Sequence, residues 1–225
     1  MPSYFSPNQF GSGQVQAQQD SFLDHFEPEL SVEPLTHFIE WFSGDQIDNI
    51  WQQEVSQGSA IFSMIGAIGE GFEIETGALN SDASLSFNDK RHYEPTGAVA
   101  CGVARNVDAT DSLFELGLNE VGAGPGGAND YSKVRCNINT TNFQGLSRNS
   151  GGVTVVDLGI PVNTNWTYCR TEITSANIQY SLDGVLSGTQ TDNRPNQPMQ
   201  PLFRGFTISG STAGHRIRYY EAYNT

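Results

Sequence analysis

The sequence predicts an all-β sandwich built as one principal domain. From Leu35 onward, short apolar stretches alternate with a period of two residues and are broken by Gly, Asn, Asp and Ser, which is typical of strands joined by tight turns. No segment sustains the 3.6-residue period of a long helix. A length of 225 residues suits a single sandwich and is enough to bury a core without a disulfide or a metal.

The expected elements follow the period-two pattern along the chain. In residues 35–42, Phe38 and Phe42 alternate with Ile39 and Trp41, which predicts a strand. Residues 45–53 predict one short helical turn, because their apolar residues recur at helical spacing. Further strands are expected at residues 60–68, 71–77, 83–88, 97–105, 112–120, 133–143, 152–160, 167–174, 177–184, 185–191, 202–209 and 215–223.

The segment from Trp166 to Pro195 carries the most specific pattern. It predicts three antiparallel strands, the last two joined by Asp183 and Gly184. Asp-Gly is a favoured pair for a two-residue hairpin, because a type I′ turn needs positive φ at both central residues.

A family resemblance rests on these C-terminal residues. The strand YCRTEIT at residues 168–174, the strand ending at Gly184, a polar loop with prolines and the final strand RIRYYEAY resemble the second half of a concanavalin A-like or laminin-G-like jelly roll. The resemblance implies that the last strand lies beside the first. We therefore expect Arg216, Arg218 and Tyr220 near residues 35–42.

The first half extends the resemblance over residues 35–225. The segment EWFSGDQIDNIWQQEV at residues 40–55 resembles the opening of jelly-roll domains in virion and tail proteins of tailed viruses of bacteria and archaea. Residues 83–106 and 113–120 resemble the strands that follow there. This fold hosts lectins, glycosidases, adhesion modules and structural parts, so the resemblance is specific for fold and weak for function.

Residues 1–34 are expected to form an extended N-terminal arm, and residues 35–225 the jelly-roll domain. The arm is rich in Gln, Ser, Gly, Pro and Asn, with too little apolar surface to order itself. Its spaced aromatic residues predict anchoring on this domain or on a neighbouring subunit, with a disordered tail as the alternative. The proposed anchors are Phe5, Phe10, Phe22 and Phe26.

The formal net charge of −14 is concentrated before Lys90, the first basic residue. The first 89 residues hold 14 of the 25 acidic groups, and no segment carries a basic stripe, which argues against nucleic-acid binding. The acidic part is either a solvated face or a surface for a basic partner. No apolar run is long enough for membrane insertion, and no export signal is recognisable.

The sequence gives no catalytic or metal-site pattern, and we expect no enzyme activity. A retaining glycosidase on this fold needs two converging carboxyls; the one local match is Glu115 with Glu120, where Gly117 replaces an aspartate and alternation places the two glutamates on opposite faces. No cofactor is expected, although Ca²⁺ is a candidate through loop oxygens of Asp108, Asp111, Asn129 and Asp130. Cys101, Cys136 and Cys169 are expected as buried small hydrophobes, with one disulfide left open.

The preferred hypothesis is a non-enzymatic viral structural protein, displayed on a virion surface as a capsid turret, decoration or tail component. It would be a homo-oligomer, trimer or pentamer, attached to other virion proteins through the arm, and its edge loops would contact a host glycan. The alternatives are a soluble carbohydrate-binding lectin and a glycoside hydrolase-like domain. Aromatic residues beside loop-like segments are the carbohydrate-binding candidates, with core packing as their alternative role: Trp166, Tyr131 and Phe143.

Overall fold

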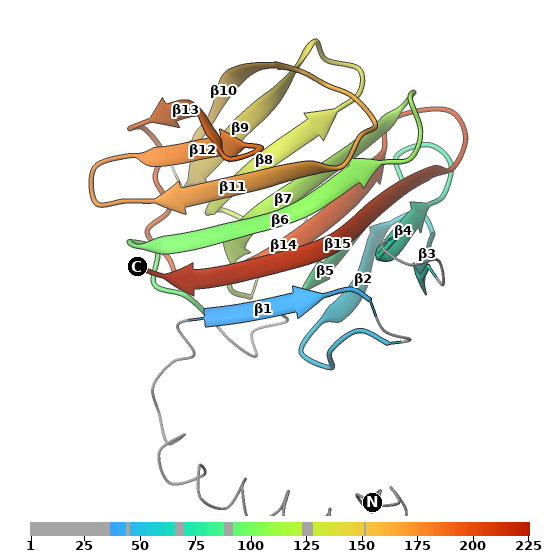
Figure 1. The fold of residues 1–225 in the computed structure, drawn as a ribbon, viewed down its shortest axis with the longest axis horizontal. Coiled ribbons are helices and arrows are strands. Elements are labelled where there is room, and N and C mark those ends of the chain that lie inside the picture. The colour runs from blue at the N-terminus through green and yellow to red at the C-terminus, as the bar shows by residue number, and fades with distance from the viewer. Residues whose placement is uncertain (1–36, 44–45, 66–69, 88–91, 123–127, 151) are drawn as a thin grey trace, which may run out of the picture. The chain divides into compact units, whose positions relative to one another are not determined.

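The computed structural model describes residues 37–43, 46–65, 70–87, 92–122, 128–150 and 152–225. Within these ranges the chain is all-β, with two antiparallel sheets stacked as a sandwich (Figure 1). The predicted all-β sandwich is therefore confirmed. The N-terminal arm, its boundary at residue 34 and the four phenylalanines proposed as anchors lie outside the described residues.

Sheet A has eight strands and forms the front layer in Figure 1. The first strand, β1 (His37–Trp41), is hydrogen-bonded to β15 (Ala213–Asn224) beside β4 (Phe72–Thr76), so that β1 and β4 share one edge of β15. The strand order across the sheet is β13 (Val185–Gln190), β12 (Ile178–Leu182), β11 (Thr167–Ile173), β6 (Ala98–Asn106), β15 (Ala213–Asn224), β4 (Phe72–Thr76) and β3 (Ala60–Met64), with β1 (His37–Trp41) off this path.

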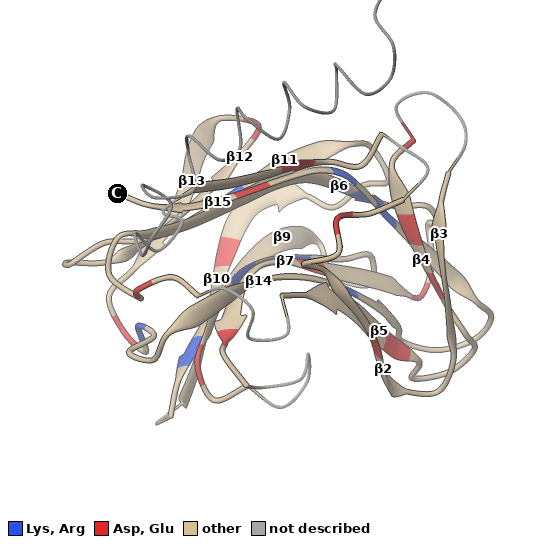
Figure 2. Cartoon of the chain, turned by 90° about the horizontal axis from the view of Figure 1, so that it is seen from below, with Lys and Arg blue, Asp and Glu red and all other residues tan. Residues whose placement is uncertain are grey.

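Sheet B has seven strands and lies behind sheet A. Figure 2 shows it as an arch whose hollow side is turned away from sheet A. Its order is β10 (Gly152–Pro161), β9 (Asn142–Asn149), β8 (Tyr131–Asn137), β7 (Ser112–Glu120), β14 (Met199–Thr207), β5 (Asp82–Ser86) and β2 (Gln52–Gln57).

The first and last strands pair as the resemblance implies. His37 lies opposite Tyr223 and Trp41 opposite Tyr219 in the β1–β15 register. The predicted alternation of β1 is also present: Phe38 is buried, whereas Ile39 and Trp41 are exposed. The hairpin between β12 and β13 turns at Asp183 and Gly184, whose φ angles of 49° and 81° are the positive values that a type I′ turn requires.

The core lies between the two sheets, where alternate side chains of each strand interdigitate. Its aromatic centre is Trp51, whose ring lies 4.9 Å from Phe87 and 5.3 Å from Tyr220, centroid to centroid. Trp51 comes from the segment expected to form a helical turn. The structure has a turn there instead, in which the Asp48 carboxylate accepts the backbone N–H of Ile50 at 2.9 Å, and β2 begins directly after it.

A chain of polar groups also crosses the core. Thr76 Oγ1 lies 2.5 Å from Thr207 Oγ1 of the other sheet and 3.1 Å from His215 Nε2. The other ring nitrogen of His215 lies 3.0 Å from Asn106 Oδ1. The His215 side chain is fully buried, and burial lowers its pKa to about 3, so the imidazole is neutral at physiological pH.

The cysteines are part of the core, and several acidic residues pair with arginines on the sheet faces. All three thiols are free and buried, as expected for small hydrophobes. Several acidic side chains of the first 89 residues pair with arginines of residues 90–225: Glu70 and Glu73 with Arg216, and Asp82 with Arg204. These acidic groups therefore form ion pairs within the domain. The two hypotheses for the acidic part, a solvated face and a surface for a basic partner, did not include such internal pairs.

Candidate functional site

Charged side chains gather on the outer face of sheet B, the side turned away from sheet A. Successive residues of a strand point to opposite faces, so in β8 Tyr131, Lys133 and Arg135 point outward while Val134 and Cys136 enter the core. Strand register brings residues from β7, β14 and β5 to the same face. A cluster of oppositely charged groups therefore forms from strands that are far apart in the sequence.

Glu115 in β7 is the centre of this cluster and is only 1 % exposed. Its Oε1 accepts hydrogen bonds from Arg135, at 2.9 Å from Nε and 2.5 Å from Nη2. Its Oε2 accepts from Lys133 Nζ at 3.3 Å and from Arg204 Nη1 at 3.1 Å. Arg204 also holds Asp82 with two bonds of 2.7 Å. We call these five residues the Glu115 cluster.

The electrostatics of the cluster fix the charge of Glu115. Burial by itself would raise the pKa of this carboxyl, but the positive charges of Lys133, Arg204 and Arg135 outweigh burial and hold the pKa well below its ordinary value. Burial lowers the pKa of Lys133 to about 8, against the opposing effect of the Glu115 charge. Glu115 is therefore ionised over the whole physiological range and serves as the counter-ion of three cations.

The part of this face over β8 and β9 is accessible to solvent. The Tyr131 ring is half-buried, and the buried Lys133 ammonium lies against it, 4.4 Å from the ring centroid. Tyr131 lies opposite Arg148 of β9, and Arg135 lies opposite Gln144. Beyond them on β10, Val153 and Val155 are about half exposed at 50 % and 51 %. We call Tyr131, Arg135, Gln144 and Arg148 the Tyr131 surface.

Gly117 explains why the second carboxylate of a glycosidase-like motif is missing from β7. A Cβ at this position would stand 2.2 Å from the backbone oxygen of Ser132 and 2.7 Å from Cα of Lys133. The backbones of β7 and β8 approach too closely for any side chain here. In the regular register of β7, which has no bulge, Glu115 and Glu120 point to opposite faces as predicted.

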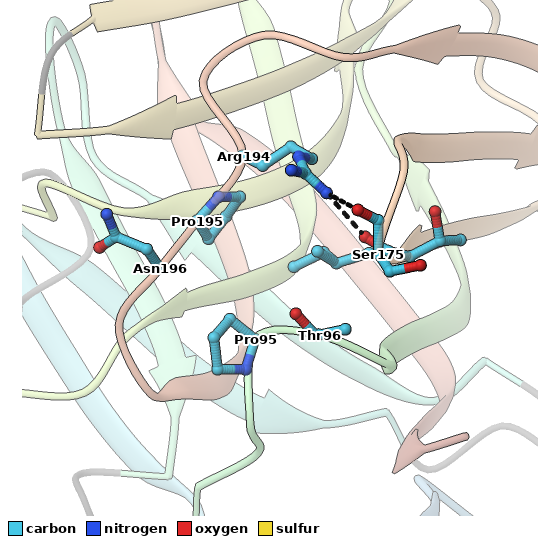
Figure 3. A pocket seen from close by; sticks show the side chains of 8 residues that line it. Pro95, Thr96, Ser175, Arg194, Pro195 and Asn196 are labelled. Atoms are coloured by element: carbon cyan, nitrogen blue, oxygen red, sulfur yellow. Dashed lines mark hydrogen bonds between the residues drawn. The ribbon is translucent and has the colours of Figure 1, made fainter.

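A pocket of about 380 Å³ lies where loops from both sheets meet at one end of the sandwich (Figure 3). Arg194 lies in it, and its guanidinium donates to the carbonyl oxygens of Thr174, at 3.2 Å, and Ser175. The arginine thus ties two loops together. The pocket is lined by apolar and polar side chains: Pro95, Thr96, Ile173, Thr174, Ser175, Arg194, Pro195 and Asn196.

The structure separates the three aromatic residues predicted to bind carbohydrate. Tyr131 is on the outer face of sheet B, as described. Trp166 lies on the other side of the sandwich, between the guanidinium groups of Arg105 and Arg218, each 4.8 Å from its ring. Phe143 is 1 % exposed and packs in the core against Phe114. Phe143 is therefore not available to stack on a sugar, which corrects its place among the candidates.

The reason for the Phe143 correction is a strand that the sequence pattern did not predict. Residues 142–149 form β9, whereas Phe143 was expected at the edge of a loop. β9 is rich in polar residues and contains Gly145, where an added Cβ would lie 2.5 Å from the Tyr180 ring. The glycine is thus a packing site for Tyr180 and not a signal for a loop.

The candidate calcium ligands brace loops. Asp130 Oδ2 accepts the backbone N–H of Asn196 at 2.6 Å and that of Gln197 at 3.1 Å. Asp108 Oδ2 accepts the N–H of Gly214 at 2.7 Å. Among the described residues, no three His, Cys, Asp or Glu side chains group closely enough to hold a metal ion. The same residues include no helix with the length and hydropathy of a membrane span.

The sequence did not reveal the Glu115 cluster or Arg148 and Gln144 as site residues. The alternation of Tyr131, Lys133 and Arg135 was visible as a charged face of one strand. What was not visible is that β7 lies beside this strand and β14 beside β7, because β14 is some 70 residues further along the chain. A cluster of this kind can be found from sequence only once the strand order is known.

Comparison with solved structures supports the jelly-roll fold. The chain is similar to a beta-glucanase of Bacillus licheniformis, with a TM-score of 0.64, 11% identity and coverage of 86% of this chain and 100% of that one. It is also similar to the laminarinase from Rhodothermus marinus, with a TM-score of 0.61, 13% identity and coverage of 83% and 96%. The chain is similar, too, to the Emp47p carbohydrate recognition domain, with a TM-score of 0.57, 12% identity and coverage of 84% of this chain and 95% of that one.

No family model and no curated relative matches the sequence. The similar structures confirm that the chain has a concanavalin A-like jelly-roll fold, and identities of 11–13% show the fold alone. They provide no link to virion proteins. They also overturn the expectation that the chain is not an enzyme, because several of the similar structures are glycoside hydrolases or a transglycosylase.

Proposed function

We propose that the chain binds carbohydrate, and that the Tyr131 surface on the outer face of sheet B is its binding site. The observation that carries the proposal is the composition of this surface. It combines a half-buried aromatic ring, Tyr131, with the guanidinium groups of Arg135 and Arg148 and the amide of Gln144. Aromatic faces suit the C–H side of a sugar ring, and planar donors and acceptors suit its hydroxyl groups.

The Glu115 cluster supports this role by holding the surface rigid. Arg135 is fixed to Glu115 by two hydrogen bonds, and the buried Lys133 ammonium both pairs with Glu115 and packs against the Tyr131 ring. Side chains whose positions are set before a ligand arrives lose little conformational entropy on binding. The names of the structures similar in fold, a beta-glucanase, a laminarinase and a carbohydrate recognition domain, agree with a saccharide ligand.

The test is a glycan array followed by calorimetric titration of the best ligand, with β-1,3-glucan and mixed-linkage β-glucan oligosaccharides included. Tyr131→Ala should weaken binding by about tenfold or more through loss of the ring. Tyr131→Phe keeps the ring and should keep most of the affinity. Val107→Ala, an exposed loop substitution elsewhere, is the control. Equal binding by parent and Tyr131→Ala would refute the assignment of this surface.

Hydrolysis of the bound glycan is the second candidate function. Its supporting observation is Glu115, an ionised carboxylate on the same face, because a retaining glycosidase attacks with such a group; the acid that protonates the leaving group would have to be a carboxyl other than Glu120, which points to the opposite face. Both Glu115 oxygens accept hydrogen bonds from cations, so attack would require one of these bonds to open. Reducing ends released from laminarin are the measurement, with Glu115→Gln as the variant and Glu120→Gln as the control. Release that persists in Glu115→Gln would exclude Glu115 as the nucleophile.

The setting of the domain is a separate proposal: a homo-oligomer, trimer or pentamer, displayed on a tailed-virus particle and attached by residues 1–34. It rests on the arm-plus-sandwich layout and on the sequence resemblance. Mass spectrometry of purified particles tests the location, and deletion of residues 1–30 tests the attachment. Normal incorporation of the truncated protein would contradict the role given to the arm.

A further inference from the structure

The outer face of sheet A carries an exposed aromatic group that the proposed function does not use. Trp41 of β1 is 66 % exposed, and its ring centroid lies 4.5 Å from that of Tyr219 on β15. Ile39, two residues before Trp41 on the same face, is 47 % exposed. Isolated exposed apolar residues are normal, but adjacent ones on a flat sheet face indicate a contact surface.

Next to this pair is a hollow of about 250 Å³, lined by His37, Glu221, Tyr223 and Asn224. The hollow is bounded by an aromatic wall, because the ring centroids of His37 and Tyr223 lie 5.5 Å apart with their planes at 73°. Its floor includes the Glu221 carboxylate. Oε1 of Glu221 lies 2.7 Å from His37 Nε2, and Oε2 accepts from the Tyr219 hydroxyl at 2.5 Å.

Glu221 is thus an oriented, ionised acceptor on the sheet surface. Burial raises the pKa of Glu221, but hydrogen bonds from Tyr219, His37 and Cys101 outweigh burial and hold the pKa below its ordinary value. The Tyr219 hydroxyl links the carboxylate directly to the Trp41–Tyr219 pair. The exposed aromatic rings and the polar hollow therefore form one continuous surface.

We propose that this surface, formed by Trp41, Tyr219, His37, Glu221 and Tyr223, is a second saccharide-binding site, separate from the Tyr131 surface. A sugar ring has an apolar C–H face and a polar edge, and the surface presents a match for each: the Trp41–Tyr219 rings, and the Glu221 and His37 groups of the hollow. The hollow is smaller than the roughly 300–1,000 Å³ of a drug-sized ligand site, so it takes one sugar ring of a longer chain.

A polysaccharide fits this surface better than a second protein copy does. A protein partner needs about 800 Å² on each side, with a continuous apolar centre. Here the Trp41 and Tyr219 rings lie side by side on β1 and β15. Two residues further along β15 is Glu221, which lies opposite Cys101 of β6, and Cys101 in turn lies opposite Arg170 of β11. The Glu221 and Arg170 side chains interrupt the apolar area, so the face lacks a continuous apolar centre.

The experiment compares retention of the full chain on immobilised β-1,3-glucan, cellulose, chitin and mannan. We expect Trp41→Ala and Glu221→Gln each to reduce retention on one of these polymers by about tenfold. Ile61→Ala is the matched control, because Ile61 is equally exposed, at 63 %, and lies on β3 of the same sheet. Thermal unfolding of each variant verifies that it is folded.

Tyr131→Ala separates this site from the one proposed on sheet B. Retention that survives Tyr131→Ala and is lost in Trp41→Ala supports a second site. Retention by Trp41→Ala and Glu221→Gln equal to that of the parent, on every polymer, would overturn the proposal. So would sedimentation showing a dimer for the parent and a monomer for Trp41→Ala, because the face would then be a self-association surface.

Discussion

Replacing Glu115 by glutamine removes the carboxylate that Lys133, Arg135 and Arg204 share, while keeping the size of the side chain. Among the described residues, Asp82 then remains as the one carboxylate paired with these cations. Removing one partner of a buried ion pair costs about 3–5 kcal/mol, because the other charges stay buried without compensation. At about 2–4 °C per kcal/mol for a domain of this size, the melting temperature should fall by about 6–20 °C.

Urea unfolding at pH 7, followed by tryptophan fluorescence, measures this loss of stability. An unchanged m-value shows that the variant exposes the same amount of surface on unfolding as the parent. Lys133→Met removes one of the orphaned cations, so the double variant should lose less free energy of unfolding than the sum of the two single losses. Glu120→Gln, at the half-exposed end of the same strand, is the control. A loss below about 1 kcal/mol for Glu115→Gln, or strict additivity in the double variant, would refute the cluster as the support of this face.

Two further predictions concern His215 and Gly117. The pKa of His215 is about 3 in the folded chain, against about 6.5 when unfolded; the unfolded state therefore takes up the proton first, and stability present above pH 6.5 should be lost as the pH falls towards 3. His215→Gln should flatten this pH dependence of the unfolding free energy, and an unchanged slope would contradict the assignment. Gly117→Ala should cost about 3 kcal/mol of stability in the same urea assay, because its Cβ would meet the Ser132 oxygen at 2.2 Å; a loss within error would show that β7 and β8 can separate freely.

Local patterns predicted the parts of the fold that depend on neighbouring residues. The alternation of Phe38 and Phe42 with exposed residues placed β1 correctly, and the Asp183–Gly184 turn followed from backbone sterics. The pattern did not predict β9, since a polar stretch containing Gly145 has the composition of a loop. Tyr180 from the other sheet occupies the space above that glycine, and such a tertiary contact has no local signal.

The candidate site was predictable only in part. Tyr131 was identified because an aromatic residue followed a glycine-rich segment, and the structure places it on an accessible face. Glu115 was noticed as a candidate for catalysis and set aside, whereas its three cationic partners come from β8 and β14. The residues of the sheet A surface were not recognised together, because β1 and β15, which carry them side by side, are far apart in the sequence.

The positions of β14 and β15 also determine when the domain can fold. These last two strands of the chain lie inside the two sheets: β15 between β6 and the β1–β4 edge, and β14 between β7 and β5. During synthesis, the earlier strands emerge with unpaired backbone edges facing the gaps that β14 and β15 later fill. Such long-range pairing is slow and leaves strand edges open to association with other chains. The nascent protein therefore depends on residues 199–225 to complete both sheets, and a chain that stops before Met199 is exposed to aggregation along both gaps.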